Sequence, residues 1–282
     1  MHLKRRKWLS ALSRPAQGYW ASRVSRPLFI IGCSRSGTTL LSRLMSSHRD
    51  VAEWSEANDV WDPIPVRRDA DGRPLHFWDD TEGYLQSWRA DLPTLGPQIR
   101  AIFGMYQALM GRQKLVNKSP INTFRIPEML ALFPDAQFVH MVRDGRAVSV
   151  SYAYKLAQKM GEHPEQYDQA VRGLPFDQMV VRLAGFWQAN LAEVARQDAA
   201  LGLTGHGALL ELTYEALCDD RAQALGQICR FAGLDADRFG PGLAREPVSS
   251  RNDKWRSEVD PTLLDRMVRC MEPELSARGY GS

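Results

Sequence analysis

Short runs of apolar residues, separated by longer stretches of mixed polarity, recur along the chain. Four of these runs, at residues 28–31, 114–116, 137–142 and 208–212, are almost free of polar positions, which is typical of parallel strands buried on both faces. Between them, apolar residues recur at helical spacing, most clearly at 176–199 and also at 215–232 and 261–277. The pattern predicts an α/β fold in which helices flank an open parallel sheet and ligands bind beyond the carboxyl ends of the strands.

Residues 54–97 break this alternation. They are rich in Pro and Asp, show no sustained period, and hold four of the eight tryptophans, Trp54, Trp61, Trp78 and Trp88. A long irregular stretch inside a compact domain is usually functional. We expect this segment to form the acceptor-side wall of a site. Its tryptophans favour an aromatic, lipid or sugar-ring acceptor, although tryptophan is equally a core residue.

Charge divides the 282 residues into a basic tail at 1–26 and a body at 27–282, which we expect to form one domain. The tail carries seven basic and no acidic residues, which leaves the body at about −4 within a net charge of +3. A body of this charge excludes a uniformly basic nucleic-acid binder. The tail is either a solvated, frayed terminus or a weak membrane-surface contact with Trp8, Leu9, Leu12 and Trp20 as anchors. Four scattered cysteines and the lack of a membrane-spanning run favour a cytoplasmic location, peripheral at the inner face of a membrane if the tail binds lipid.

The clearest chemical signal follows the first apolar run. Residues 32–39, GCSRSGTT, have the GxxxxG spacing of a phosphate-binding loop between a strand and a helix. Backbone N–H groups of such a loop and of the helix start converge on an anion. A nucleoside triphosphatase carries Lys where this chain has Thr38, so the usual triphosphate chemistry is not expected.

Two segments of the chain carry a family resemblance: RSGTTL at 35–40 and FVHMVRDGRAVSVSY at 138–152. Together they resemble the sulfotransferases that use 3′-phosphoadenosine 5′-phosphosulfate, with Ser34 in place of the family's proline before the first segment. The resemblance extends from about Pro27 to Pro261 and is greatest to the tyrosylprotein-type and bacterial sulfotransferases. It implies a three-layer, P-loop-type fold and transfer of a sulfuryl group, without a metal, to a hydroxyl, or as a second choice an amine, of a small-molecule, lipid or glycan acceptor.

The resemblance also assigns residues to the donor. Arg143 and Ser151 correspond to the residues that bind the 3′-phosphate, Tyr214 lies on the nucleotide side, and Lys254 is the expected contact in a C-terminal loop that closes over the nucleotide. The 5′-phosphosulfate would be held by the loop amides and by Arg35, Ser36, Gly37, Thr38 and Thr39. An ordinary solvated loop remains an alternative at Lys254, because the family's usual signature is absent there.

Two residues are expected to carry the transfer. Lys118, in LVNKSP, matches the lysine of the tyrosylprotein type that neutralises the leaving group, and Glu56, in WSEAND, stands where that type has its catalytic base. A surface lysine and a solvated loop acid are the alternatives, and Glu53 and Asp59 are neighbouring carboxylates that could take the place of Glu56. His140 belongs to a buried strand and is expected to be packed rather than catalytic.

Two other functions stay open at this point. A small-molecule or nucleotide kinase would share the phosphate loop but needs a Lys at position 38 and an acidic magnesium ligand. A non-catalytic nucleotide-binding protein that uses its tail at membranes would share the fold but has no need of Glu56 and Lys118.

Overall fold

The computed structural model describes residues 14–64, 67–72, 74–75, 77, 80–162, 173–240 and 250–281. Trp8, Leu9, Leu12 and Trp78 lie outside the described residues. The strands are β1 (Leu28–Ile31), β2 (Val51–Ser55), β3 (Arg67–Arg68), β4 (Pro74–Leu75), β5 (Lys114–Lys118), β6 (Gln137–Val142) and β7 (Leu209–Thr213). The helices are α2 (Arg14–Ala21), α3 (Thr38–Ser46), α4 (Asn58–Trp61), α5 (Thr81–Leu109), η1 (Pro120–Phe124), α6 (Ile126–Leu132), α7 (Gly145–Glu162), α8 (Phe176–Leu201), α9 (Tyr214–Asp219), α10 (Arg221–Ala232), η3 (Ala236–Arg238), η5 (Lys254–Ser257), α11 (Pro261–Met271) and α12 (Glu274–Ala277).

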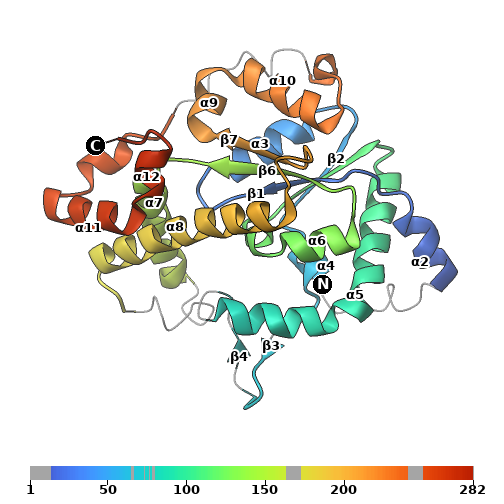
Figure 1. Cartoon of the computed structure of the whole chain (residues 1–282), viewed down its shortest axis with the longest axis horizontal. Helices are drawn as coiled ribbons and strands as arrows, with labels where there is room; N and C mark the ends of the chain where they lie inside the picture. Colours follow the sequence, from blue (N-terminus) through green and yellow to red (C-terminus); the bar gives the residue numbers. More distant parts are fainter. Residues whose placement is uncertain are drawn as a thin grey trace.

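Five strands form one parallel sheet in the order β2-β5-β1-β6-β7, with β1 at its centre. Its two faces are covered by different helices, with α3, α9 and α10 on one side and α5, α6 and α8 on the other (Figure 1). This arrangement confirms the predicted three-layer α/β fold. Strands β2 and β5 lie on one side of β1, and β6 and β7 lie on the other, so the strand order changes direction at β1. Such a change of direction opens a crevice at the carboxyl ends of the strands, where α/β proteins bind ligands.

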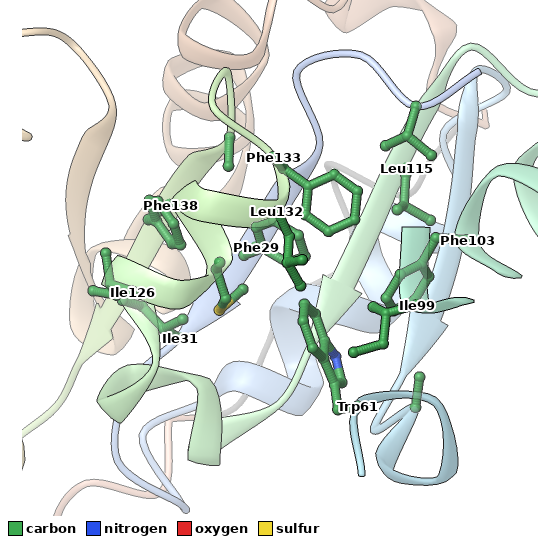
Figure 2. Close-up of a cluster of buried hydrophobic side chains, with 14 of the residues drawn as sticks. Phe29, Ile31, Trp61, Ile99, Phe103, Leu115, Ile126, Leu132, Phe133 and Phe138 are labelled. Carbon is green, nitrogen blue, oxygen red and sulfur yellow. The ribbon is translucent and has the colours of Figure 1, made fainter. Parts of the chain in front are cut away.

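Alternate side chains of β1 enter two separate cores. Leu28 and Ile30 pack with residues of α3 and α10, while Phe29 and Ile31 face the opposite layer. Figure 2 shows this second core, where aromatic rings from β1, α4, α5 and β6 pack together. Because both faces of the central strands are buried, their sequences are apolar at consecutive positions.

The prediction that residues 54–97 are irregular is wrong for much of this segment. Its first residues end strand β2, and residues 81–97 belong to the long helix α5, which continues to Leu109. Pro93 and Pro97 lie inside that helix, where each removes a backbone hydrogen bond at a cost of roughly 3 kcal/mol. Burial of Trp88, Ile99 and Phe103, worth about 1.5–3 kcal/mol for each side chain, offsets this cost.

The tryptophans of this segment are mainly structural. Trp61 and Trp88 are fully buried, and the Trp88 indole N–H donates to the carbonyl of Trp61 at 2.8 Å. Trp54 stacks against Tyr106, with ring centroids 4.6 Å apart. Of the two alternatives for these residues, core packing therefore accounts for the three described tryptophans.

Two predicted helices and the basic tail also differ from the sequence prediction. The predicted helix at 215–232 is two helices, α9 and α10, because Asp220 leaves the helical conformation and its side chain accepts from the N–H of Gln223, which starts α10. The predicted helix at 261–277 is α11 followed by α12, because Pro273 holds the preceding Glu272 in an extended conformation. The basic tail is not entirely frayed, since α2 packs so closely on α5 that a Cβ on Gly104 would lie 1.8 Å from the Trp20 carbonyl oxygen.

Candidate active site

The loop between β1 and α3 is shaped by two glycines. Gly32 has φ 130° and Gly37 has φ 90°. A Cβ on Gly32 would lie 2.3 Å from the carbonyl oxygen of Met141, and one on Gly37 would lie 2.7 Å from the ring of Tyr214. The loop therefore lies against β6 and Tyr214 in a form that side chains at these positions would obstruct.

Helix α3 starts directly after this loop with Thr38 and Thr39. Its first turn has no acidic residue and no side-chain cap, so its N–H groups and the positive end of its dipole remain available to an anion. The hydroxyl of Ser36 is buried and has no hydrogen-bond partner among the described residues. A buried polar group of this kind is normally paired, and an oxygen of a bound anion would pair it.

Arg35 of this loop contacts Arg143 and Ser151, which lie 108 and 116 residues further along the chain. The Arg35 Nε donates to the Ser151 hydroxyl at 3.0 Å, and Arg143 Nη1 donates to the Arg35 carbonyl at 3.0 Å. Arg35 has φ 75°, an uncommon conformation for a residue with a side chain. The structure thus brings the residues predicted for the two ends of the donor into direct contact.

The guanidinium of Arg143 is held on several sides. It stacks 4.3 Å from the ring centre of Tyr214, while Nε donates to the Asn252 side-chain oxygen at 3.0 Å and Nη2 to the Arg251 carbonyl at 2.8 Å. Burial lowers the pKa of Arg143, although an arginine stays charged at neutral pH. Three of its five N–H groups are used in these contacts and the bond to Arg35, so two have no partner among the described residues and are available to an anion.

Glu56 and Lys118 form an ion pair at the carboxyl ends of β2 and β5. The Lys118 side chain is 1% exposed and the Glu56 side chain 54% exposed. The N–H of Glu56 donates to the Lys118 carbonyl at 2.6 Å, and Glu56 has φ 47°. This backbone bond holds Glu56 beside the end of β5, where its carboxylate meets the buried ammonium group of Lys118.

The two neighbouring carboxylates lie differently. Glu53 points toward α3 and accepts a hydrogen bond from the Ser42 hydroxyl, and burial raises its pKa. Asp59 lies on the exposed side of α4. His140 is fully buried, with Nδ1 3.3 Å from the Glu211 carboxylate, in agreement with a packed imidazole.

Lys254 begins the short helix η5 and is exposed, and within the described part of the chain no contact joins its side chain to Arg35 or Arg143. Its contact with the nucleotide stays a prediction. The same loop instead reaches Arg143 through Asn252 and the carbonyl of Arg251. Asn252 was not predicted, and only its position two residues before Lys254, in the loop expected to close over the nucleotide, pointed to it.

Comparison with known proteins identifies the family. Residues 27–238 match the model of the sulfotransferase family, so the chain belongs to this family. It is 30% identical over 127 residues to a putative protein-tyrosine sulfotransferase of Caenorhabditis briggsae, a match covering 45% of this chain and 42% of that protein. It is 27% identical over 150 residues to the protein-tyrosine sulfotransferase of Drosophila melanogaster, covering 51% and 28%. The matches thus span less than half the length of these curated relatives.

Solved structures agree on the fold. The sulfotransferase STF9 of Mycobacterium avium superposes with a TM-score of 0.58 at 18% identity, covering 90% of this chain and 77% of that one. The sulfotransferase domain of the curacin biosynthetic pathway gives 0.58 at 20% identity, covering 92% and 99%. At these identities the likeness concerns the fold alone.

Among the described residues, no helix is long and apolar enough to cross a lipid bilayer.

Proposed function

We propose that this sulfotransferase moves the sulfuryl group of 3′-phosphoadenosine 5′-phosphosulfate to a hydroxyl of an acceptor. The observation that carries the proposal is the convergence of Arg35, Arg143 and Ser151 beside the loop, with bonds of 3.0 Å joining them. A nucleotide with anionic groups at both ends of its ribose needs two adjacent anion sites. The open start of α3 and the buried Ser36 hydroxyl supply one site, and the free N–H groups of Arg143 supply the other.

Within this proposal Lys118 and Glu56 act at opposite ends of an in-line displacement. The acceptor oxygen forms a bond to sulfur while the bond from sulfur to the bridging phosphate oxygen breaks. Glu56 takes the acceptor's proton, and Lys118 neutralises the charge that develops on the bridging oxygen. In the structure the two side chains pair with each other. An anionic donor competes for Lys118, which leaves the half-exposed carboxylate available to the acceptor.

Transfer of a labelled group tests this proposal. The protein is incubated, in a buffer with a chelator that removes magnesium, with donor carrying labelled sulfur and with a metabolite extract as the source of acceptors. We expect a labelled product bearing the group as a sulfate ester, formed by the wild-type protein and strongly reduced for Lys118→Ala. Nucleotide binding without any consumption of the labelled donor would instead support the non-catalytic alternative.

A further inference from the structure

The contacts around Arg143 continue through a carboxylate to the C-terminal segment. Glu215, in the first turn of α9, accepts hydrogen bonds through Oε1 from the Asn252 Nδ2 at 2.8 Å and from the backbone N–H of Asp144 at 3.1 Å. Its other oxygen, Oε2, accepts from the Tyr280 hydroxyl at 3.0 Å. One side chain therefore joins the residue after Arg143, the loop that contacts Arg143, and the C-terminal segment.

The orientation of the Asn252 amide depends on this carboxylate. Because Nδ2 donates to Glu215, the amide oxygen faces Arg143, whose Nε donates to it at 3.0 Å. If the carboxylate were absent or turned away, the amide could rotate and present its NH₂ group to the guanidinium. Two donors would then face each other, and the bond to Arg143 Nε would be lost.

Tyr280 holds the second oxygen of this carboxylate and is itself firmly placed. Its N–H donates to the carbonyl of Leu275, a buried residue, and the neighbouring Arg278 donates to Glu211 at 3.1 Å. Burial, together with the nearby Glu215 charge, raises the pKa of the Tyr280 phenol well above its usual value. The hydroxyl therefore remains a proton donor throughout the physiological pH range.

We infer that Glu215 and Tyr280 are positioning residues for the 3′-phosphate: they hold Asn252, and through it Arg143, in the orientation that leaves two guanidinium N–H groups directed at the ligand. The inference rests on the proposed donor, because Arg143 is assigned there to the 3′-phosphate. It extends the nucleotide site to the C-terminal segment, 137 positions beyond Arg143 in the sequence. Neither residue contacts the nucleotide in this account.

The test compares two tyrosine variants that each lose one hydroxyl bonded to a carboxylate. Tyr280→Phe removes the bond to Glu215, and Tyr84→Phe is the matched control, since its hydroxyl donates to Asp62. Calorimetry measures the affinity of each protein for adenosine 3′,5′-bisphosphate and for 5′-AMP. We expect Tyr280→Phe to lower the preference for the bisphosphate about threefold to tenfold, mainly through weaker bisphosphate binding, while Tyr84→Phe keeps the wild-type preference.

The alternative outcomes separate this inference from the proposed function. An unchanged preference in Tyr280→Phe, or an equal loss of affinity for both nucleotides, would overturn the positioning role while leaving the donor assignment intact. A wild-type protein without any preference would overturn the donor assignment itself, and this inference with it.

A double-mutant cycle tests whether Glu215 acts through Arg143. Glu215→Gln keeps the shape of the side chain, and thermal unfolding checks that each variant is folded. We expect Glu215→Gln to reduce the bisphosphate preference in the wild-type background and to have no further effect when Arg143 is already alanine, because the group being positioned is then gone. Fully additive losses would contradict a role exerted through Arg143.

Discussion

Replacing Glu56 by glutamine should lower turnover without lowering nucleotide affinity. The amide keeps the size of the side chain but cannot take a proton, so turnover should fall by roughly 10²–10⁴. The carboxylate is also the partner of Lys118, which is 1% exposed while Glu56 is 54% exposed. A pair with one partner this exposed is worth at most about 1 kcal/mol. Removing the charge releases Lys118 for the donor's phosphate, so affinity for adenosine 3′,5′-bisphosphate should stay normal or rise by up to about fivefold.

Single-turnover kinetics and calorimetry measure these two effects separately. Glu53→Gln is the matched control, because Glu53 lies three residues before Glu56, in β2, but is bonded to Ser42, and we expect it to keep most of the turnover. Acceptors with a more acidic hydroxyl should partly rescue Glu56→Gln, since they need less help in losing the proton. Near-normal turnover of Glu56→Gln across acceptors of different acidity would refute the assignment, and a large loss in Glu53→Gln would move the base there.

Four other predictions concern three single substitutions and the basic tail. Lys118→Ala should slow transfer and also weaken donor binding, with little rescue by acidic acceptors, which kinetics with acceptors of graded acidity will check. Gly37→Ala should lower both stability and nucleotide affinity, because its Cβ would lie 2.7 Å from the Tyr214 ring at φ 90°; we expect a loss of about 1–3 kcal/mol in denaturant unfolding. Burial lowers the pKa of Lys114 to about 8 in the folded chain, from 10.5. Between these two values the unfolded chain binds more protons than the folded chain. The free energy of unfolding of the wild type, relative to that of Lys114→Met, should therefore rise from about pH 8 to pH 10.5. Deleting residues 1–26 should abolish a weak, salt-sensitive co-sedimentation with anionic vesicles; undiminished co-sedimentation would discard that role for the tail.

The sheet could be predicted from the sequence wherever a strand carries a run of apolar residues. The four apolar runs correspond to β1, β5, β6 and β7. Of the two edge strands, β7 was found because it carries Leu209, Leu210 and Leu212, whereas β2 was missed because Glu53 and Ser55 interrupt its apolar residues. Helix α5 was missed because Pro93 and Pro97 oppose helix formation locally, and only tertiary burial of its apolar side chains favours it.

The site could be predicted in part. The family resemblance led to Arg35, Arg143 and Ser151, which lie together in the structure. It also led to Glu56 and Lys118, which form an ion pair. The roles of all five residues remain predictions. The supporting residues could not be found this way. Glu215 meets Asn252 and Tyr280 across 37 and 65 residues of sequence, and no local pattern encodes contacts between such distant segments. Asn252 was missed for the same reason, because its contacts are with Arg143 and Glu215, which are distant in the sequence.

The central claim is that the converging arginines bind a nucleotide phosphorylated at both ends of its ribose. Calorimetry without magnesium, comparing adenosine 3′,5′-bisphosphate with 5′-AMP, measures this directly. Charged hydrogen bonds of about 1.5–3 kcal/mol each predict at least a tenfold preference for the bisphosphate. In Arg143→Ala this preference should fall toward one, with 5′-AMP binding little changed. Equal affinities of the wild-type protein for the two nucleotides would contradict the account.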